Sequence, residues 1–238
     1  RSLRIVIFLA ELNDMELYGA DVSNAYLEAE TREKVYIVGG LGFGELQGHT
    51  LLIHKALYGL KSSGKRWHEK LFDILRAMNF TPSKADSDVW YRRVNDAYEY
   101  IAVYVDDLAI ASKQPGKIID ELTTQFALKL KGVGPLTYHL GCDFVRDTDG
   151  TLSYGPKKYI EKILANYERL FGEAPRMAAS PLVQNDHPEI DDSILLNEAG
   201  ITQYQSLIGE LQWCIALGRF DIMTAIMTMG RFRICPRQ

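Results

Sequence analysis

The chain has 238 residues and an average soluble composition, with 47% hydrophobic, 24% charged and 11% aromatic residues. This composition excludes intrinsic disorder and collagen-like repeats, and three widely spaced cysteines argue against a disulfide scaffold or a zinc site. The formal net charge of -4 argues against nucleic-acid binding over the whole surface, so any such binding has to use a local basic patch.

The most apolar stretch, residues 3–12, is interrupted by Arg4. It is far shorter than the roughly 20 residues that span a bilayer, so we expect no membrane segment. It also lacks the small-residue cleavage site of a signal peptide. Because the chain begins with Arg1 and not with Met, we expect it to be excised from a longer protein.

Hydrophobic periodicity predicts a mixture of helices and strands in the first part of the chain. The expected elements are a helix over residues 3–12, a strand over 15–21, a helix-like stretch over 23–31, strands over 34–38 and 49–56 around a Gly-rich loop, and a helix from 62 to 78. Thr81 and Pro82 end that helix.

The same patterns continue to the end of the chain. They predict strands over 90–93, 98–104 and 108–112, a helix over 118–130, a loop over 132–135, a strand over 137–145, a hairpin turn over 147–150, a helix over 160–170, an exposed linker over 174–200, and helices over 202–216 and 220–232. The sequence therefore predicts a mixed helix and strand region to about residue 170, followed by a helical part.

The strongest chemical signal is a pair of adjacent carboxylates, Asp106 and Asp107, in the predicted hairpin turn after Tyr104 and Val105. Two such charges about 4 Å apart repel by roughly 4 kcal/mol at an effective dielectric of 20, so a structure that directs both inward needs a cation between them. The structural alternative is an ordinary turn, in which Asp caps backbone N–H groups.

Asp21 lies at the end of another apolar strand. If the sheet places that strand beside the hairpin, three carboxylates converge on one edge, and such a group suits two magnesium ions that carry out phosphoryl transfer. The structural alternative for Asp21 is a helix N-cap.

Several strings in a fixed order carry a resemblance to a known family. They are Asp21-Val-Ser-Asn-Ala-Tyr-Leu27, Lys55-Ala-Leu-Tyr-Gly-Leu60, Ser83-Lys-Ala-Asp-Ser-Asp88, Tyr104-Val-Asp-Asp107, Leu140-Gly141, Lys158-Tyr159-Ile160 and Tyr204-Gln-Ser-Leu-Ile-Gly209. Together they resemble the reverse transcriptase of copia-type retrotransposons over nearly the whole chain.

The resemblance implies an α+β right-hand polymerase fold with an antiparallel palm sheet flanked by helices. Residues 1–170 would form the palm with partial fingers, residues 171–200 a linker, and residues 201–238 a thumb-like helical segment. The implied function is an RNA-directed DNA polymerase domain that uses deoxynucleoside triphosphates on an RNA or DNA template–primer duplex. The implied partners are the rest of the Gag-Pol polyprotein, including integrase and RNase H, in a cytoplasmic virus-like particle.

The resemblance also implies roles for individual residues of the polymerase site. Asp21, Asp106 and Asp107 match the family's catalytic carboxylates, which with the backbone of Val22 would hold two Mg2+ ions, or Mn2+ in their place. Tyr26 matches the bulky residue that stacks under the sugar of the incoming nucleotide and excludes a 2′-hydroxyl. The alternative for Tyr26 is a core aromatic. Nucleotide contacts from the turn would come from Tyr104 and Val105.

Nucleic-acid contacts follow from two further matches. Leu140 and Gly141 match the strand that grips the primer, and Gln205, Gly209 and Trp213 match a thumb helix face on the minor groove of the template–primer. These last three residues are four apart and share one side of a helix, away from the apolar stripe. Simple helix packing is the alternative.

Residues 55–76 hold six basic side chains against only two acids and form a candidate template-binding patch, with a solvated helix face as the alternative. A weaker second candidate consists of Lys129, Lys131, Lys157, Lys158 and Lys162. One departure from the family is Ser62-Ser63-Gly64, where many relatives have Gln-Ala-Pro, so a glutamine contact to the nucleotide is not carried over.

Two other classes of function stay open on the sequence. One is a catalytically decayed retroelement remnant that acts as a nucleic-acid-binding module. The other is a two-metal nuclease, which would explain the carboxylates but neither Tyr26 nor the thumb helix.

Overall fold

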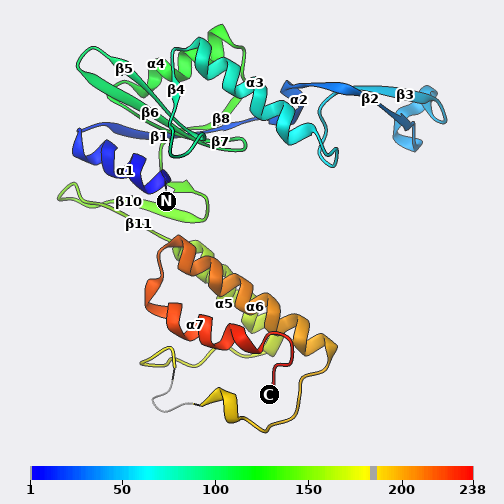
Figure 1. The fold of residues 1–238 in the computed structure, drawn as a ribbon, viewed down its shortest axis with the longest axis vertical. Helices are drawn as coiled ribbons and strands as arrows, with labels where there is room; N and C mark the ends of the chain where they lie inside the picture. The colour runs from blue at the N-terminus through cyan, green and yellow to red at the C-terminus, as the bar shows by residue number, and fades with distance from the viewer. Residues whose placement is uncertain (1, 183–186, 238) are drawn as a thin grey trace. The chain divides into compact units, whose positions relative to one another are not determined.

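The computed structural model describes residues 2–182 and 187–237. They divide into two compact units, unit 1 (Arg1–Leu136) and unit 2 (Thr137–Gln238). Figure 1 shows the elements of each unit, coloured from blue at the N-terminus to red at the C-terminus. Residues 137–170 form a small sheet and a helix that pack within unit 2.

Unit 1 is built on a six-stranded antiparallel sheet. Its strands, in spatial order, are β4 (Thr81–Pro82), β5 (Val89–Val94), β6 (Ala97–Tyr104), β7 (Asp107–Ser112), β1 (Glu16–Val22) and β8 (Leu130–Pro135). β1 therefore lies between β7 and β8, and its backbone is hydrogen-bonded on both sides. The mixture of helices with an antiparallel sheet confirms the α+β class.

Helices cover both faces of this sheet (Figure 1). α1 (Ser2–Leu12) packs on β6 and β7, and it buries Val6 and Ala10. On the other face lie α3 (Ser63–Ala77) and α4 (Pro115–Asp120). They contribute Trp67, Leu71 and Ile118 to the main core cluster, which also contains residues of the sheet. The periodic apolar residues predicted for residues 62–78 thus form the buried face of α3.

A hairpin and a short helix complete unit 1. β2 (Glu30–Val38) pairs with β3 (Thr50–Lys55), and the pair extends away from the six-stranded sheet (Figure 1). The loop between them contains a 3-10 segment over Leu41–Leu46. The helix-like stretch predicted over residues 23–31 is shorter than expected, because only α2 (Ala25–Glu28) is helical and β2 already begins at Glu30.

The carboxyl-terminal edge of unit 1 corrects two predictions. The expected helix over 118–130 ends early: α4 stops at Asp120, and a π-helical turn follows over Glu121–Gln125. The hydroxyls of Thr123 and Thr124 donate to helix carbonyls, and Ala127 has a positive φ of 53°, so the backbone leaves the helix. The expected loop over 132–135 is instead part of strand β8.

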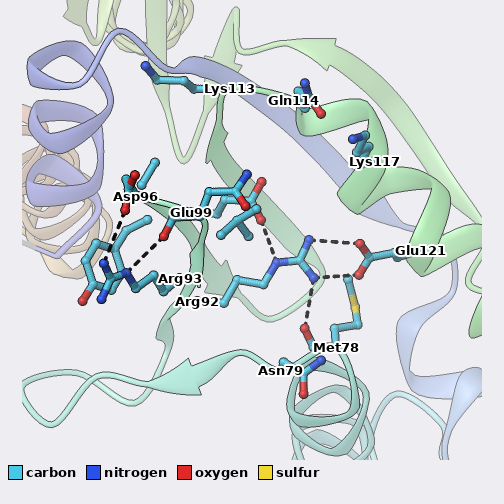
Figure 2. Close-up of a pocket in the computed structure, with 14 residues that line it drawn as sticks. Met78, Asn79, Arg92, Arg93, Asp96, Glu99, Lys113, Gln114, Lys117 and Glu121 are labelled. Carbon is cyan, nitrogen blue, oxygen red and sulfur yellow. Dashed lines mark hydrogen bonds and ion pairs between the residues drawn. The ribbon is translucent and has the colours of Figure 1, made fainter.

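At one end of the sheet, a hollow of about 780 Å³ is lined by the β5–β6 hairpin and by residues that follow β7. Arg92 is one of the residues that line this hollow, and it forms ion pairs with two carboxylates (Figure 2). Its guanidinium donates to Glu99 at 2.6 Å and to both oxygens of Glu121 at 2.7 and 3.0 Å. Burial disfavours the charge of Arg92, but the hydrogen bonds from these two carboxylates outweigh it and raise the Arg92 pKa.

Unit 2 combines a three-stranded antiparallel sheet with helices. The strands are β9 (Tyr138–His139), β10 (Cys142–Arg146) and β11 (Leu152–Gly155), and the helices are α5 (Lys157–Phe171), α6 (Glu198–Leu217) and α7 (Met223–Met229). Short 3-10 segments lie over Pro188–Ile190, Phe220–Ile222 and Gly230–Phe232. Of the predicted linker, residues 183–186 lie outside the described residues.

The strand predicted over 137–145 is interrupted. Leu140 and Gly141 have φ values of 49° and 87°, so they form a two-residue turn between β9 and β10. Two successive positive φ angles are typical of the tight turns that join antiparallel strands. The predicted turn over 147–150 is confirmed, since β10 pairs with β11.

Candidate active site

Two neighbouring strands, β1 and β7, and the turn before β7 bring the predicted catalytic carboxylates to one region of unit 1. Asp21 lies near the end of β1, where its register partner on β7 is Asp107 and its partner on β8 is Lys131. The backbone N–H of Val22 donates to the carbonyl of Asp106 at 2.8 Å. The N-cap alternative for Asp21 is wrong, because Asn24 is the N-cap of α2.

The Tyr104–Asp107 turn joins β6 to β7, as the sequence predicts. Within it, Val105 has a φ of 57°, a left-handed conformation that is uncommon for a β-branched residue. The indole N–H of Trp67 donates to the Val105 carbonyl at 2.6 Å. Helix α3 is therefore bonded directly to the turn that carries two of the three carboxylates.

Negative charge is concentrated at this turn. Burial raises the pKa of Asp107, the charges of Asp106 and Asp21 raise it further, and Lys131 opposes them. The Lys131 Nζ lies 3.1 Å from Asp21 Oδ1, which is itself buried and accepts no hydrogen bond among the described residues. Lys131 thus places a positive charge beside the carboxylates.

The donor chemistry here fits a divalent metal ion. Carboxylate oxygens are the hard ligands that Mg2+ prefers, and a cation would offset both the burial and the charge repulsion that raise the Asp107 pKa. In residues 2–182 and 187–237, however, no three acidic, histidine or cysteine side chains stand in a metal-binding arrangement. The backbone brings the acids together, while the cation in contact with Asp21 is the Lys131 ammonium.

Two tyrosines lie beside the carboxylates. The rings of Tyr26 and Tyr58 have centroids 4.3 Å apart. Partial desolvation raises the pKa of the Tyr58 hydroxyl although Tyr58 is 73% exposed, and Asp106, Tyr26 and Asp21 add to the increase. Tyr26 also packs against the main core cluster, so it combines a core contact with a position near the acids.

Sequence reasoning missed Trp67, Tyr58 and Lys131 as members of this site. Tyr58 belongs to one of the strings that carried the family resemblance, and this was the available signal for it. The sequence pattern indicates only that Trp67 lies in the predicted helix over residues 62–78 and that Lys131 belongs to the second basic cluster. Their roles depend on pairings between distant segments, which no local pattern specifies.

In unit 2, the structure brings two of the predicted nucleic-acid-binding positions together. A Cβ atom added to Gly141 would lie 3.5 Å from Trp213 Nε1 and 3.2 Å from Leu217 Cδ1. The turn at Leu140 and Gly141 therefore packs against the end of α6, and Trp213 stays 46% exposed.

Gln205 and Gly209, the other two predicted positions on α6, lie on the exposed side of the helix with Trp213. Ile208 and Cys214 are buried on another side. Gln205 donates from its side chain to the carbonyl of Arg233 at 2.8 Å. A Cβ atom added to Gly209 would meet no atom within 4 Å. The described part of unit 2 thus offers no packing reason for glycine at this position.

The basic patch predicted over residues 55–76 is largely balanced by acids. Lys65 and Arg66 pair with Glu69, Lys70 pairs with Glu28, and Arg76 pairs with Asp73. These contacts favour the alternative of a solvated helix face for α3. Lys55 and Lys61 form no ion pair within the described part of the chain. Separately, no described helix is both long and apolar enough to cross a bilayer.

Comparisons with known proteins agree with the motifs. A family model described as reverse transcriptase (RNA-dependent DNA polymerase) matches residues 1–177. A protein attributed to transposon Ty5-1 of Saccharomyces cerevisiae is 29% identical over 91% of the chain and 70% of its own length. The retrovirus-related Pol polyprotein from transposon TNT 1-94 of Nicotiana tabacum is 28% identical over 97% of the chain. The corresponding polyprotein from transposon RE1 of Arabidopsis thaliana is 26% identical over 100% of the chain.

The chain spans only 18% and 16% of the lengths of the two plant polyproteins. It thus corresponds to one segment of a much longer product in these relatives. Since the family model covers most of the chain and includes Asp21, Asp106 and Asp107, the chain belongs to the reverse transcriptase (RNA-dependent DNA polymerase) family, as a domain of the type found in retrotransposon Pol polyproteins.

Proposed function

We propose that this domain copies an RNA or DNA template by adding deoxynucleotides to a primer, with Asp21, Asp106 and Asp107 as its catalytic carboxylates. The observation that carries the proposal is the register between β1 and β7, which pairs Asp21 with Asp107. The hydrogen bond from Val22 N–H to the Asp106 carbonyl adds the third acid to the same place. Residues from distant parts of the chain thus converge on one pair of neighbouring strands.

The carboxylates are proposed to hold two Mg2+ ions, or Mn2+, together with the backbone of Val22. When bound, such a pair of ions would stabilise both the attacking and the leaving oxygen of the phosphoryl transfer. The ammonium of Lys131, 3.1 Å from Asp21 Oδ1, supports this proposal, because a positive charge already lies beside these carboxylates. Asp21 would have to exchange its contact with Lys131 for the ion.

Unit 1 is proposed to supply the palm, with β2 and β3 as part of the fingers. The exposed face of α6 and the adjoining turn at Leu140 and Gly141 are proposed to contact the template–primer. Tyr26 would lie under the sugar of the incoming nucleotide, and Tyr104 and Val105 would contact the same nucleotide. Exposure of Tyr104, Val105 and Trp213 supports roles for these residues in binding.

Primer extension on poly(rA) with oligo(dT), dTTP and Mg2+ tests the proposal. We expect Asp106→Asn to reduce extension by at least about a thousandfold, because the variant loses a charged ligand of the reacting centre. Asp96→Asn is a matched control, since Asp96 lies in the β5–β6 hairpin at the other end of the strands. Near-wild-type extension by Asp106→Asn would refute the assignment. Template–primer binding by a wild-type chain without extension would favour the non-catalytic remnant.

A further inference from the structure

Trp67 connects the core of unit 1 to the catalytic turn. Its side chain is 1% exposed and belongs to the main core cluster beneath the sheet. Its indole N–H nevertheless reaches the carbonyl of Val105, at 2.6 Å, in a turn where Val105 itself is 42% exposed. One side chain thus joins the buried face of α3 to an exposed turn between Tyr104 and Asp106.

The turn needs such a contact because of its backbone conformation. A left-handed φ of 57° at a β-branched valine is strained, and residues in sparsely populated conformations persist only where their surroundings fix them. The Trp67 hydrogen bond acts on the carbonyl of this strained residue. Since Asp106 follows directly, the orientation of its peptide depends on that carbonyl.

We propose that Trp67 is a positioning residue of the polymerase site, which holds the Tyr104–Asp107 turn in its catalytic conformation through the hydrogen bond to Val105. The proposal rests on the function proposed above for Asp106 and Asp107. Trp67 touches none of the reacting groups and acts only through the turn.

Helix α3 also lies beside Tyr26. A Cβ atom added to Gly64 would lie 3.7 Å from the Tyr26 hydroxyl. The start of α3 therefore lies beside the Tyr26 hydroxyl, and Trp67 of the same helix is bonded to the Tyr104–Asp107 turn.

Trp90 offers a matched control in the same core. It is 0% exposed and belongs to the same cluster, but its indole nitrogen has no hydrogen-bond partner among the described residues. Replacing either tryptophan by phenylalanine removes a similar buried volume. Only Trp67→Phe also removes a hydrogen bond to the catalytic turn.

Steady-state kinetics of Trp67→Phe and Trp90→Phe test the proposal. We expect Trp67→Phe to lower kcat for dTTP by about tenfold or more with KM within about twofold, because a lost buried hydrogen bond changes an equilibrium by this order. Trp90→Phe should keep kcat within about threefold of wild type. Equal losses of kcat in the two variants would overturn the proposal, because both would then reflect core packing.

Hydrogen exchange of the full chain tests the same inference without relying on activity. We expect Trp67→Phe to accelerate exchange of the Val22 amide, which donates to Asp106, about tenfold relative to the Ile110 amide inside β7. Replacing Trp67 by β-(3-benzothienyl)alanine removes the donor but keeps the ring shape, which covers the case in which Trp67→Phe does not fold. Unchanged relative exchange in the folded variant would overturn the positioning role. If the wild-type chain were inactive but Trp67→Phe still accelerated exchange of the Val22 amide, the proposed function would be refuted and the positioning role would stand.

Discussion

The position proposed for Tyr26, under the sugar of the incoming nucleotide, predicts a preference for deoxyribose over ribose. We expect Tyr26→Val to raise the efficiency of UTP relative to dTTP by about tenfold or more, because a bulky ring excludes a 2′-hydroxyl by steric clash and a smaller side chain does not. The measurement is the ratio of kcat/KM for dTTP and UTP on one template.

Tyr36→Val is a matched control for this substitution. Tyr36 is a tyrosine on β2 with an exposed fraction of 57%, and among the described residues its ring packs against neither Tyr26 nor Tyr58. Its substitution should leave the sugar ratio unchanged. If Tyr26→Val also preserves the ratio while synthesis continues, Tyr26 is a packing residue only.

His139 makes the stability of unit 2 sensitive to acid. Burial lowers its pKa from 6.5 to about 4, so the unfolded chain binds a proton between these values and the folded chain does not. Above pH 6.5 this group therefore does not lower the free energy of unfolding. As the pH decreases towards 4, it lowers that free energy by up to about 3 kcal/mol. Thermal unfolding of His139→Phe should show a flatter dependence on pH over this range.

The exposed His49 provides the control for this measurement. His49→Phe should retain the pH dependence of the wild type. The interpretation of His139 would be contradicted if His139→Phe lost stability with falling pH as steeply as the wild type.

At the residue scale, the sequence correctly predicted that Asp21 lies near the end of a strand and that Asp106 and Asp107 lie at a hairpin turn, because apolar stretches flank each of them. It could not predict that Lys131 would lie 3.1 Å from Asp21, since that contact depends on the pairing of β8 with β1. Local patterns specify which residues end a strand. Neighbours across the sheet are set by tertiary packing.

Among the elements, α6 contains a glycine that its surroundings do not require. We expect Gly209→Ala to stabilise the protein by about 1 kcal/mol, because alanine is the better helix former and the added methyl group meets no atom within 4 Å. If the template–primer approaches this face closely, the same substitution lowers its affinity. Thermal unfolding and fluorescence anisotropy measure the two effects.

Ser206→Ala is the control on the same helix, because Ser206 is also exposed and lies off the Gln205–Trp213 face. It should leave affinity unchanged. Weaker stability of Gly209→Ala would contradict the open surroundings of Gly209, and unchanged affinity would place the nucleic acid elsewhere.

The element scale also shows where periodicity misleads. Ile118 and Leu122 are buried at helical spacing, and Leu130 continues the same spacing into what is actually strand β8. A partly buried strand residue and a helix residue can fill the same periodic position. Threonine hydroxyls and the positive φ at Ala127 end the helix, and these signals are weaker in a sequence than the apolar pattern.

Over the whole molecule, a net charge of -4 confines nucleic-acid binding to local positive charge. We expect template–primer affinity to fall steeply between about 50 and 200 mM salt, with a log–log slope of about -0.9 per phosphate contacted. Anisotropy measured over this salt range provides the slope, and a flat dependence would contradict the prediction.

Two lysines refine this expectation. Lys61 forms no ion pair within the described chain, whereas Lys65 lies 3.9 Å from Glu69. Lys61→Gln should reduce the magnitude of the salt slope by about 0.9, the value for one phosphate contact. Lys65→Gln should reduce it less. If both substitutions changed the salt slope equally, the ion pair with Glu69 would not weaken the contribution of Lys65 to template–primer binding.

The position of β1 between β7 and β8 has a consequence for how activity is acquired during folding. The β6–β7 hairpin is local and can form early, but Asp21 joins it only through contacts with high sequence separation. During synthesis, β1 leaves the ribosome long before either of its neighbours exists. Nucleotide addition therefore depends on a late event, the insertion of β1, and recovery of activity on refolding should lag behind formation of the hairpin.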